Sequence, residues 1–160
     1  MLRRTLGNSK GAQAGMTLLE LILACAILLV LSSVALPMAR YSLTLHKEGE
    51  LRRALLDIRE AIDRYKDVAD HQQIRTAMGS DGYPPDLQTL VKGVPLGNTG
   101  DKKIRFLRQI PVDPMTGKAD WGLRGSQDDW DSKNWGGNNV FDVYSLSSGT
   151  ALDGTRYSDW

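Results

Sequence analysis

The chain has 160 residues, of which 41% are hydrophobic, 24% charged and 7% aromatic, a mixture that suits one modest globular domain and not two. Its 20 Lys and Arg residues against 19 Asp and Glu residues exclude a strongly basic nucleic-acid-binding protein. The single cysteine excludes an intramolecular disulfide framework and a cysteine-rich metal cluster.

The even average charge conceals three segments of different character. Residues 1–15 carry three basic side chains and no acid, and residues 21–39 carry no charged side chain at all. Residues 40–160 hold the remaining 17 basic side chains and 18 of the 19 acidic ones; the nineteenth acid is Glu20. The chain therefore divides into a basic leader at 1–15, an apolar helix at 16–39 and a globular domain at 40–160.

The uncharged run at 21–39 predicts a membrane-spanning helix. Nineteen helical residues extend about 28 Å, which is close to the thickness of the hydrocarbon core of a bilayer. Because the basic residues precede this helix, we expect a cytoplasmic N-terminus and a translocated domain. The run is too long for a secretory signal peptide. A lipoprotein signal at Cys25 is excluded because apolar residues follow the cysteine.

Glu20 begins this apolar helix, where a carboxylate is costly unless it stays near the headgroups or meets a cation. An ordinary helix-start acid, favoured by the helix dipole, is the simpler interpretation. Residues 15–20 read GMTLLE, after a basic leader and before the apolar helix. This combination resembles the processing site of type IV prepilins and pseudopilins.

The resemblance implies that prepilin peptidase cleaves between Gly15 and Met16 and methylates the new N-terminus. Glycine suits this position because its backbone can approach a protease closely. In this family, the Glu20 carboxylate of one subunit pairs with the Met16 ammonium of its neighbour; an intramolecular pair, four residues apart on one helix face, is the alternative. Pro37 deletes a helical hydrogen bond, and the resemblance implies that the helix near it stretches or melts in assembled filaments.

Beyond Arg40 the sequence predicts an amphipathic helix, with Gly49 as a weak point. Charged residues, Glu48 and Arg59 among them, are assigned to its polar faces. The stripe lasts under three heptads, which favours packing on the chain's own domain over a coiled coil. Its apolar positions recur at steps of four and three residues: Leu51, Leu55, Ile58, Ile62, Tyr65 and Ala69.

The rest of the chain is rich in loops, since 12 of its 16 glycines lie at Gly79 or later. We predict a short helix at 86–91 capped by Asp86, and a strand or helical turn at 104–107. The best strand is 139–146, with a second near 119–124. A polar loop at 127–139 (the 127–139 loop) holds Trp130 and Trp135. The predicted fold is α+β and pilin-like, with the long helix packed on a small C-terminal antiparallel sheet.

The domain also resembles the major pseudopilin of type II secretion, the G subunit. The resemblance implies a structural subunit of the pseudopilus, a periplasmic helical filament that helps to push folded proteins through the outer-membrane secretin. Type IV pilins usually close a C-terminal loop with two cysteines, which this domain lacks; a subunit of a motility, adhesion or DNA-uptake filament is the alternative. The matching segments are Tyr83-Pro84, Leu87–Val91, Leu107–Pro114, Asp142–Leu146 and Trp160.

The same resemblance implies partners and a location. The partners are further copies of the chain, minor pseudopilins, prepilin peptidase and the inner-membrane assembly platform, with no nucleic acid among them. The chain is expected to cross the bacterial inner membrane once, with its domain in the periplasm, before it joins the filament. The sequence has no nucleophile elbow, HExxH or phosphate loop, so we expect no enzymatic activity.

The C-terminal loop of this family usually binds calcium, an ion that takes six to eight oxygen ligands. Leu146 matches a carbonyl donor, and Ser148, Asp153 and Asp159 would add hydroxyl and carboxylate oxygens. The Gly-x-Asp-Gly that usually follows the carbonyl donor is replaced here, so a turn at Asp153 with an exposed tail is the alternative. Without calcium, packing of three tryptophans would order the loop: Trp130, Trp135 and Trp160.

Overall fold

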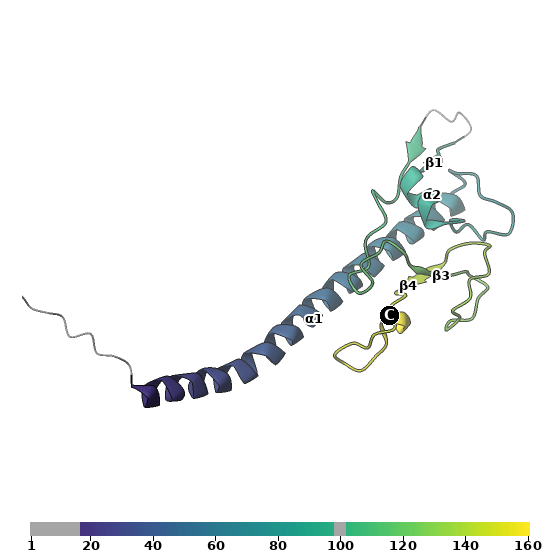
Figure 1. The fold of residues 1–160 in the computed structure, drawn as a ribbon. Helices are drawn as coiled ribbons and strands as arrows, with labels where there is room; N and C mark the ends of the chain where they lie inside the picture. The colour runs from purple at the N-terminus through teal and green to yellow at the C-terminus, as the bar shows by residue number, and fades with distance from the viewer. Residues whose placement is uncertain (1–16, 98–101) are drawn as a thin grey trace, which may run out of the picture. The chain divides into compact units, whose positions relative to one another are not determined.

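The computed structural model describes residues 17–97 and 102–160, apart from the side chains of 34–37 (Figure 1). The chain forms two compact units, Met1–Tyr41 and Ser42–Trp160. Helix α1, Leu18–Asp70, contributes residues to both units. The predicted leader and the Gly15–Met16 bond lie outside the described residues.

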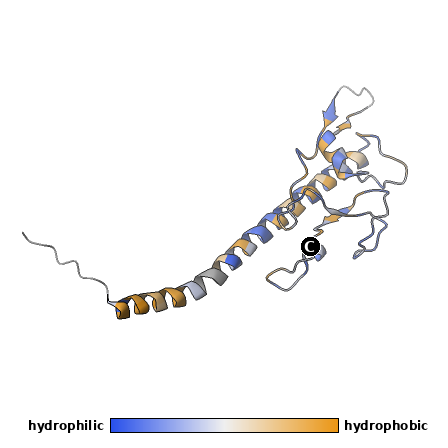
Figure 2. Ribbon diagram, viewed as in Figure 1, coloured by the Kyte–Doolittle hydropathy of each residue, from blue (hydrophilic) through white to orange (hydrophobic). Residues whose placement is uncertain are grey.

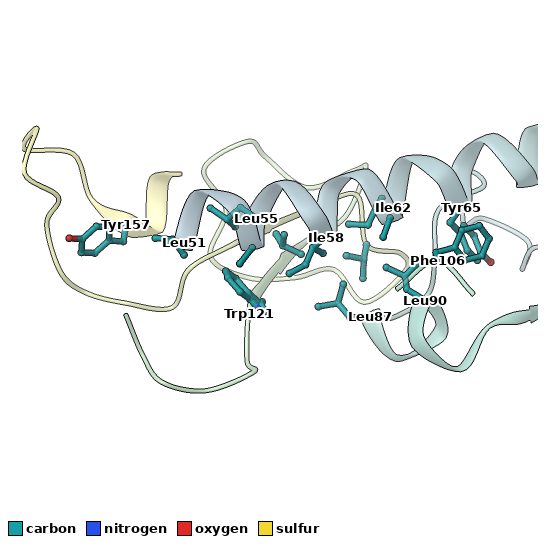
Figure 3. Packing of buried hydrophobic residues seen from close by; sticks show 14 of the residues in the cluster. Leu51, Leu55, Ile58, Ile62, Tyr65, Leu87, Leu90, Phe106, Trp121 and Tyr157 are labelled. Carbon is teal, nitrogen blue, oxygen red and sulfur yellow. The ribbon is translucent and has the colours of Figure 1, made fainter. Parts of the chain in front are cut away.

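Helix α1 carries the hydrophobic core of the second unit. The predicted stripe is confirmed, because Leu51, Leu55, Ile58 and Ile62 are almost inaccessible to solvent. Figure 3 shows these side chains directed toward residues of the following segments, Leu87, Leu90, Phe106 and Trp121 among them. The helix continues through Gly49. The predicted weak point is thus not a break, because burial of the stripe just beyond it outweighs a glycine cost of roughly 1 kcal/mol.

The short helix α2, Leu87–Lys92, begins and ends as its sequence predicts. The Asp86 side chain accepts a hydrogen bond of 2.7 Å from the backbone N–H of Thr89, which confirms the predicted N-cap. The helix ends at Gly93, whose φ of 78° suits glycine. The Leu90 carbonyl accepts hydrogen bonds of 3.0 Å from the N–H groups of both Phe106 and Leu107, which join the next segment to α2.

The strands are shorter than predicted and form two separate antiparallel pairs. β1 (Val94–Pro95) pairs with β2 (Lys103–Ile104), and β3 (Gly122–Arg124) pairs with β4 (Asp142–Tyr144). The predicted strand at 139–146 is reduced to β4, because residues before it bond elsewhere: Val140 N–H donates to the Pro84 carbonyl at 2.8 Å. The α+β architecture is confirmed, with two small sheets in place of one.

Two glycines offer a matched test of this packing. A Cβ at Gly122 would overlap the Tyr144 ring on the paired strand, whereas a Cβ at Gly49 would meet no atom within 4 Å. We expect Gly122→Ala to destabilise the Ser42–Trp160 unit by about 2 kcal/mol and Gly49→Ala to stabilise it by about 0.5–1 kcal/mol. Urea denaturation measures both, and shifts of equal sign would contradict this packing.

Candidate processing and assembly site

Helix α1 begins at a side-chain cap that involves the predicted site residue Glu20. The backbone N–H of Glu20 donates to the Thr17 hydroxyl at 3.2 Å, and the N–H of Leu21 donates to the Thr17 carbonyl at 3.1 Å. Thr17 and Glu20 have the spacing of a capping box, which supplies partners for N–H groups at a helix start. The Glu20 side chain is exposed and forms no ion pair with another residue in the described part of the chain. Its carboxylate is therefore open to a cation from elsewhere.

The first half of α1 presents an apolar surface that the described residues leave uncovered. Leu18 and Leu19 are 76% and 77% exposed, and large aliphatic side chains as far as Leu31 remain more than half exposed or close to it. Figure 2 shows this stretch as a continuous run of hydrophobic residues. By length and composition it can cross a membrane. Water would be a poor solvent for so large an apolar surface, so a bilayer or other apolar helices must cover it.

The structure locates part of the predicted site. Glu20 lies in the first turn of α1, where the positive end of the helix dipole also favours an acid. Gly15 and Met16, the two residues at the predicted cleavage, lie outside the described residues. Pro37 lies within α1, but its side chain is also outside the described part. The predicted pair of Glu20 with a Met16 ammonium therefore stays a prediction.

A comparison with known protein families identifies this region. The family described as the prokaryotic N-terminal methylation motif matches residues 10–36. The match supports membership of the type IV pilin-like family. It spans the predicted cleavage bond, Glu20 and most of the apolar run, and it implies processing by prepilin peptidase and assembly into a filament. No curated protein and no solved structure matches the chain.

The motif and the apolar helix together indicate the general class of function. They support a single-pass anchor in the inner membrane and point to a structural subunit rather than an enzyme. The predicted chemistry of this site is that of a substrate for processing: a bond to be cut, an amine to be methylated and a carboxylate to be neutralised.

The C-terminal segment (residues 146–160) is held to α1 by a carboxylate that the sequence analysis assigned to a polar face. Glu48 is only 7% exposed. Its Oε1 accepts hydrogen bonds from the Leu152 backbone N–H at 2.8 Å and from the Tyr157 hydroxyl at 3.1 Å. Burial, together with the bond to Glu48, raises the pKa of Tyr157, so this hydroxyl keeps the proton that it donates. Position 48 precedes Leu51 by three residues and continues the stripe, which is the signal that could have revealed its burial.

Arg59 is a second contact that the sequence analysis placed on a polar face. Its Nε lies 2.7 Å from Asp142 Oδ1, and its NH2 group donates to the carbonyl oxygens of Val143 and Trp160 at 3.1 and 3.0 Å. Arg59 therefore connects α1 with both β4 and the C-terminal segment. Sequence could not indicate this, because all three acceptors lie more than 80 positions away.

Only one of the three tryptophans predicted to order this segment packs on it. The Trp160 ring meets Tyr157 edge to face at 5.3 Å, and the Arg52 guanidinium lies 4.0 Å from its centroid. Trp135 belongs to the 127–139 loop and donates to the Asn139 carbonyl at 2.7 Å. The predicted packing role is wrong for Trp130, which is 86% exposed because no segment among the described residues covers its side of the loop.

The two carboxylates predicted to bind calcium, Asp153 and Asp159, already have other partners. Asp153 accepts from the N–H and the hydroxyl of Thr155 at 2.9 and 2.6 Å and faces Arg52 at 3.7 Å. These contacts, led by the Thr155 hydroxyl, hold the pKa of Asp153 below its usual range. Asp159 faces Lys133 at 3.4 Å. Among the described residues no group of three or more His, Cys, Asp or Glu side chains could hold a metal.

Leu146 and Ser148, the other two predicted ligands, lie in a cationic setting. They line a surface pocket of about 400 Å³ together with Lys133 and Arg156, whose charges repel a cation. The donor set in this arrangement does not fit calcium. Calcium binding stays a prediction from the resemblance, and it is tested below.

The first prediction from this site concerns processing. Intact-mass measurement on membrane-extracted protein should show a chain that begins at Met16 and carries an N-methyl group. Gly15→Val should abolish cleavage, because a branched side chain prevents the close approach of the protease to the backbone. Ala14→Val, one residue further from the cut, is the matched control and should still be processed. A mature filament subunit that retains Met1 would contradict the family assignment.

The second prediction concerns the contact of Glu48 with the C-terminal segment. Glu48→Ala leaves the buried Tyr157 hydroxyl and the partly buried Leu152 N–H without an acceptor, so we expect a loss of about 2 kcal/mol in the stability of the Ser42–Trp160 unit. Glu48→Gln keeps an acceptor oxygen and should lose less. Glu50→Ala, on the exposed side of the same helix, should change stability by less than about 0.5 kcal/mol. Urea denaturation compares the three variants.

The third prediction from this site concerns the effect of calcium on the thermal stability of the Ser42–Trp160 unit. Since Asp153 and Asp159 have other partners, and Lys133 and Arg156 line the pocket beside Leu146, we expect the Tm to be the same in millimolar calcium and in chelator. Trp160→Ala, which removes the packing on Tyr157, should lower the Tm. A Tm that rises with calcium in the natural chain, but not in Asp153→Ala, would establish the metal site instead.

Proposed function

We propose that this chain is a structural subunit of the type II secretion pseudopilus. In this function, copies of the chain assemble into a periplasmic helical filament that helps to push folded proteins through the outer-membrane secretin. The observation that carries the proposal is the N-terminal methylation motif. It precedes a domain in which the segments that resemble a pseudopilin contact one another. The domain faces the periplasm in this proposal, and the leader faces the cytoplasm.

The resembling segments are in direct contact within the Ser42–Trp160 unit. The Pro84 carbonyl accepts from Val140, next to β4, at 2.8 Å. Asp113, which is fully buried, accepts a hydrogen bond of 2.7 Å from the hydroxyl of Ser145. A buried carboxylate is costly unless it is hydrogen-bonded, so this pair restricts how the two segments can pack.

The Leu90 carbonyl accepts from the Leu107 N–H at 3.0 Å, which joins Leu87–Val91 to Leu107–Pro114. Arg59 adds Trp160 to the same arrangement. Its guanidinium binds Asp142 of β4 and the carbonyl of Trp160. Asp142 also faces Arg124 of β3 at 3.6 Å. The residues that carry the resemblance are therefore those that determine the packing of the unit, and this supports a pseudopilin-like domain over an unrelated domain on a pilin-like anchor.

Assembly in the proposed function begins in the membrane. Prepilin peptidase removes residues 1–15, and the Glu20 carboxylate of an incoming subunit pairs with the Met16 ammonium of its neighbour. In an apolar filament core each of these charges would be costly alone, so only the aligned register is favourable. The inner-membrane assembly platform adds subunits, and minor pseudopilins associate with the same filament.

A type IV pilin-like subunit of a motility, adhesion or DNA-uptake filament is the alternative function, because the methylation motif is common to both. The domain offers one observation against a typical type IV pilin: Cys25, in the apolar helix, is the single cysteine of the chain. A disulfide-closed C-terminal loop is therefore excluded.

The test of the proposed function is Glu20→Val in the producing bacterium. The variant should insert into the membrane and be processed, because it makes the helix more apolar. It should yield few or no filaments and lose protein secretion, since an uncompensated buried charge costs about 3–5 kcal/mol at each contact.

Thr17→Val is the matched control, because it removes the cap to the Glu20 N–H at a cost of about 1 kcal/mol and keeps the carboxylate. It should assemble and secrete. Normal filament yield from Glu20→Val would reduce Glu20 to a helix-start residue, and loss of motility or DNA uptake without loss of secretion would favour the alternative function.

A further inference from the structure

Trp130 lies on the surface of the 127–139 loop with carboxylates on either side. Its side chain is 86% exposed, and the flanking Asp129 and Asp131 are exposed as well. Neither aspartate forms an ion pair with another residue in the ranges 17–97 and 102–160. A large indole in water, between two unpaired negative charges, is unusual for a surface that only contacts solvent.

The 127–139 loop is held in one conformation although it is rich in glycine. Asp128 accepts hydrogen bonds from the N–H groups of Gly125 and Gly136 at 2.7 and 3.1 Å. These two bonds lower the pKa of Asp128, so it stays charged at neutral pH. The Asn139 amide, which is buried, donates to the Ser80 carbonyl at 3.0 Å. The loop therefore presents Trp130 at a fixed place, and little entropy is lost when it binds.

The positive charge of this loop is directed away from Trp130. Lys133 donates to the Ser158 carbonyl at 2.9 Å and lies 4.8 Å from the centroid of the Tyr144 ring. It is thus bound to the body of the unit and does not neutralise Asp129 or Asp131. The exposed part of the loop offers an aromatic ring framed by negative charge.

The same unit contains a pocket of opposite character, which we name the arginine pocket. It has a volume of about 420 Å³ and combines apolar side chains with three guanidinium groups. Arg64 is fixed there, because its NH2 group donates to the Phe106 carbonyl at 2.9 Å. The lining residues are Arg64, Arg105, Phe106, Leu107 and Arg108.

We propose that Trp130 of one copy enters the arginine pocket of the next copy, where Asp129 and Asp131 pair with Arg105 and Arg108. Leu107, which is half-buried, gives the indole an apolar contact, and a guanidinium over the ring adds a cation–π interaction. Opposite charges on the two surfaces fix the orientation of the contact. The inference rests on the proposed function, because it describes how the domains of a filament contact one another.

A second copy of this chain is the partner that the observations favour. Both surfaces belong to the same chain, and Trp130 is too exposed to occupy a pocket of its own molecule. A contact between two different surfaces of identical subunits is head-to-tail, and it repeats as an open helical filament when its rotation does not close a ring. A depression that shares Arg64 and Arg108 with the arginine pocket also contains Glu60, which lies 3.7 Å from Arg64 and occupies its charge. The aspartates of the loop are therefore assigned to Arg105 and Arg108, which form no ion pair within the described part of the chain.

The contact is too small to hold two subunits together alone, since stable interfaces bury about 1,200–2,000 Å². It adds to the packing of the N-terminal helices and sets the order of the domains. The full-length chain in its membrane is therefore the system in which it must be tested.

The test is a charge exchange between the two surfaces. Asp129→Arg with Asp131→Arg should reduce filament yield several-fold, and so should Arg105→Glu with Arg108→Glu. When all four substitutions are combined in one chain, every contact again joins opposite charges, so filament yield should return close to that of the natural chain. Trp130→Ala should also reduce yield. Membrane insertion, processing and thermal melting should be unchanged in every variant.

Lys118→Glu with Asp120→Arg is the matched control, because both residues are exposed and lie outside the two surfaces. This control should assemble like the natural chain. If the natural chain forms filaments but the combined variant does not regain filament yield, this contact is overturned and the proposed function is not. A natural chain that forms no filaments would overturn the proposed function and this contact with it.

Discussion

Burial of one stripe of α1 is the constraint on which the Ser42–Trp160 unit depends. Its strands are two or three residues long, so neither strand pair can bury a sheet face large enough to fold alone. Leu51, Leu55, Ile58 and Ile62 instead supply one continuous apolar surface, on which α2 and the loops pack. Loops with little secondary structure can be ordered in this way because each contributes one or two buried side chains to a rigid helix.

The features that sequence predicted well are those that short-range periodicity or local chemistry determines. The α1 stripe follows from spacing alone, and the Asp86 cap follows from one side chain and the N–H three residues later. The methylation motif is equally local, since the leader charges, Gly15 and Glu20 all lie within the first 20 residues of the sequence. None of these needs knowledge of a distant partner.

The features that sequence missed depend on partners far along the chain. Strand ends at β4 are set by the bond of Val140 to Pro84, and the burial of Glu48 is set by Tyr157. When a charged residue lies in register with an apolar stripe, the sequence does not show whether its side chain is exposed or is buried against a hydrogen-bond donor. The two cases have the same sequence pattern, and only the partner distinguishes them. Trp130 is the converse case: its aromatic side chain predicts a packed residue, but the fold leaves it exposed to solvent.

The bond between Glu48 and Tyr157 joins positions 109 residues apart, so it affects the order in which the unit can form. Contacts of such long sequence separation form late, because the intervening chain must first be confined. While a growing chain lacks residues 152–157, the Glu48 carboxylate has no donor from that segment. The core of an incomplete chain is therefore open at the end of the stripe where Glu48 lies. The fold of the Ser42–Trp160 unit is complete only when the last residues that Glu48 binds are in place.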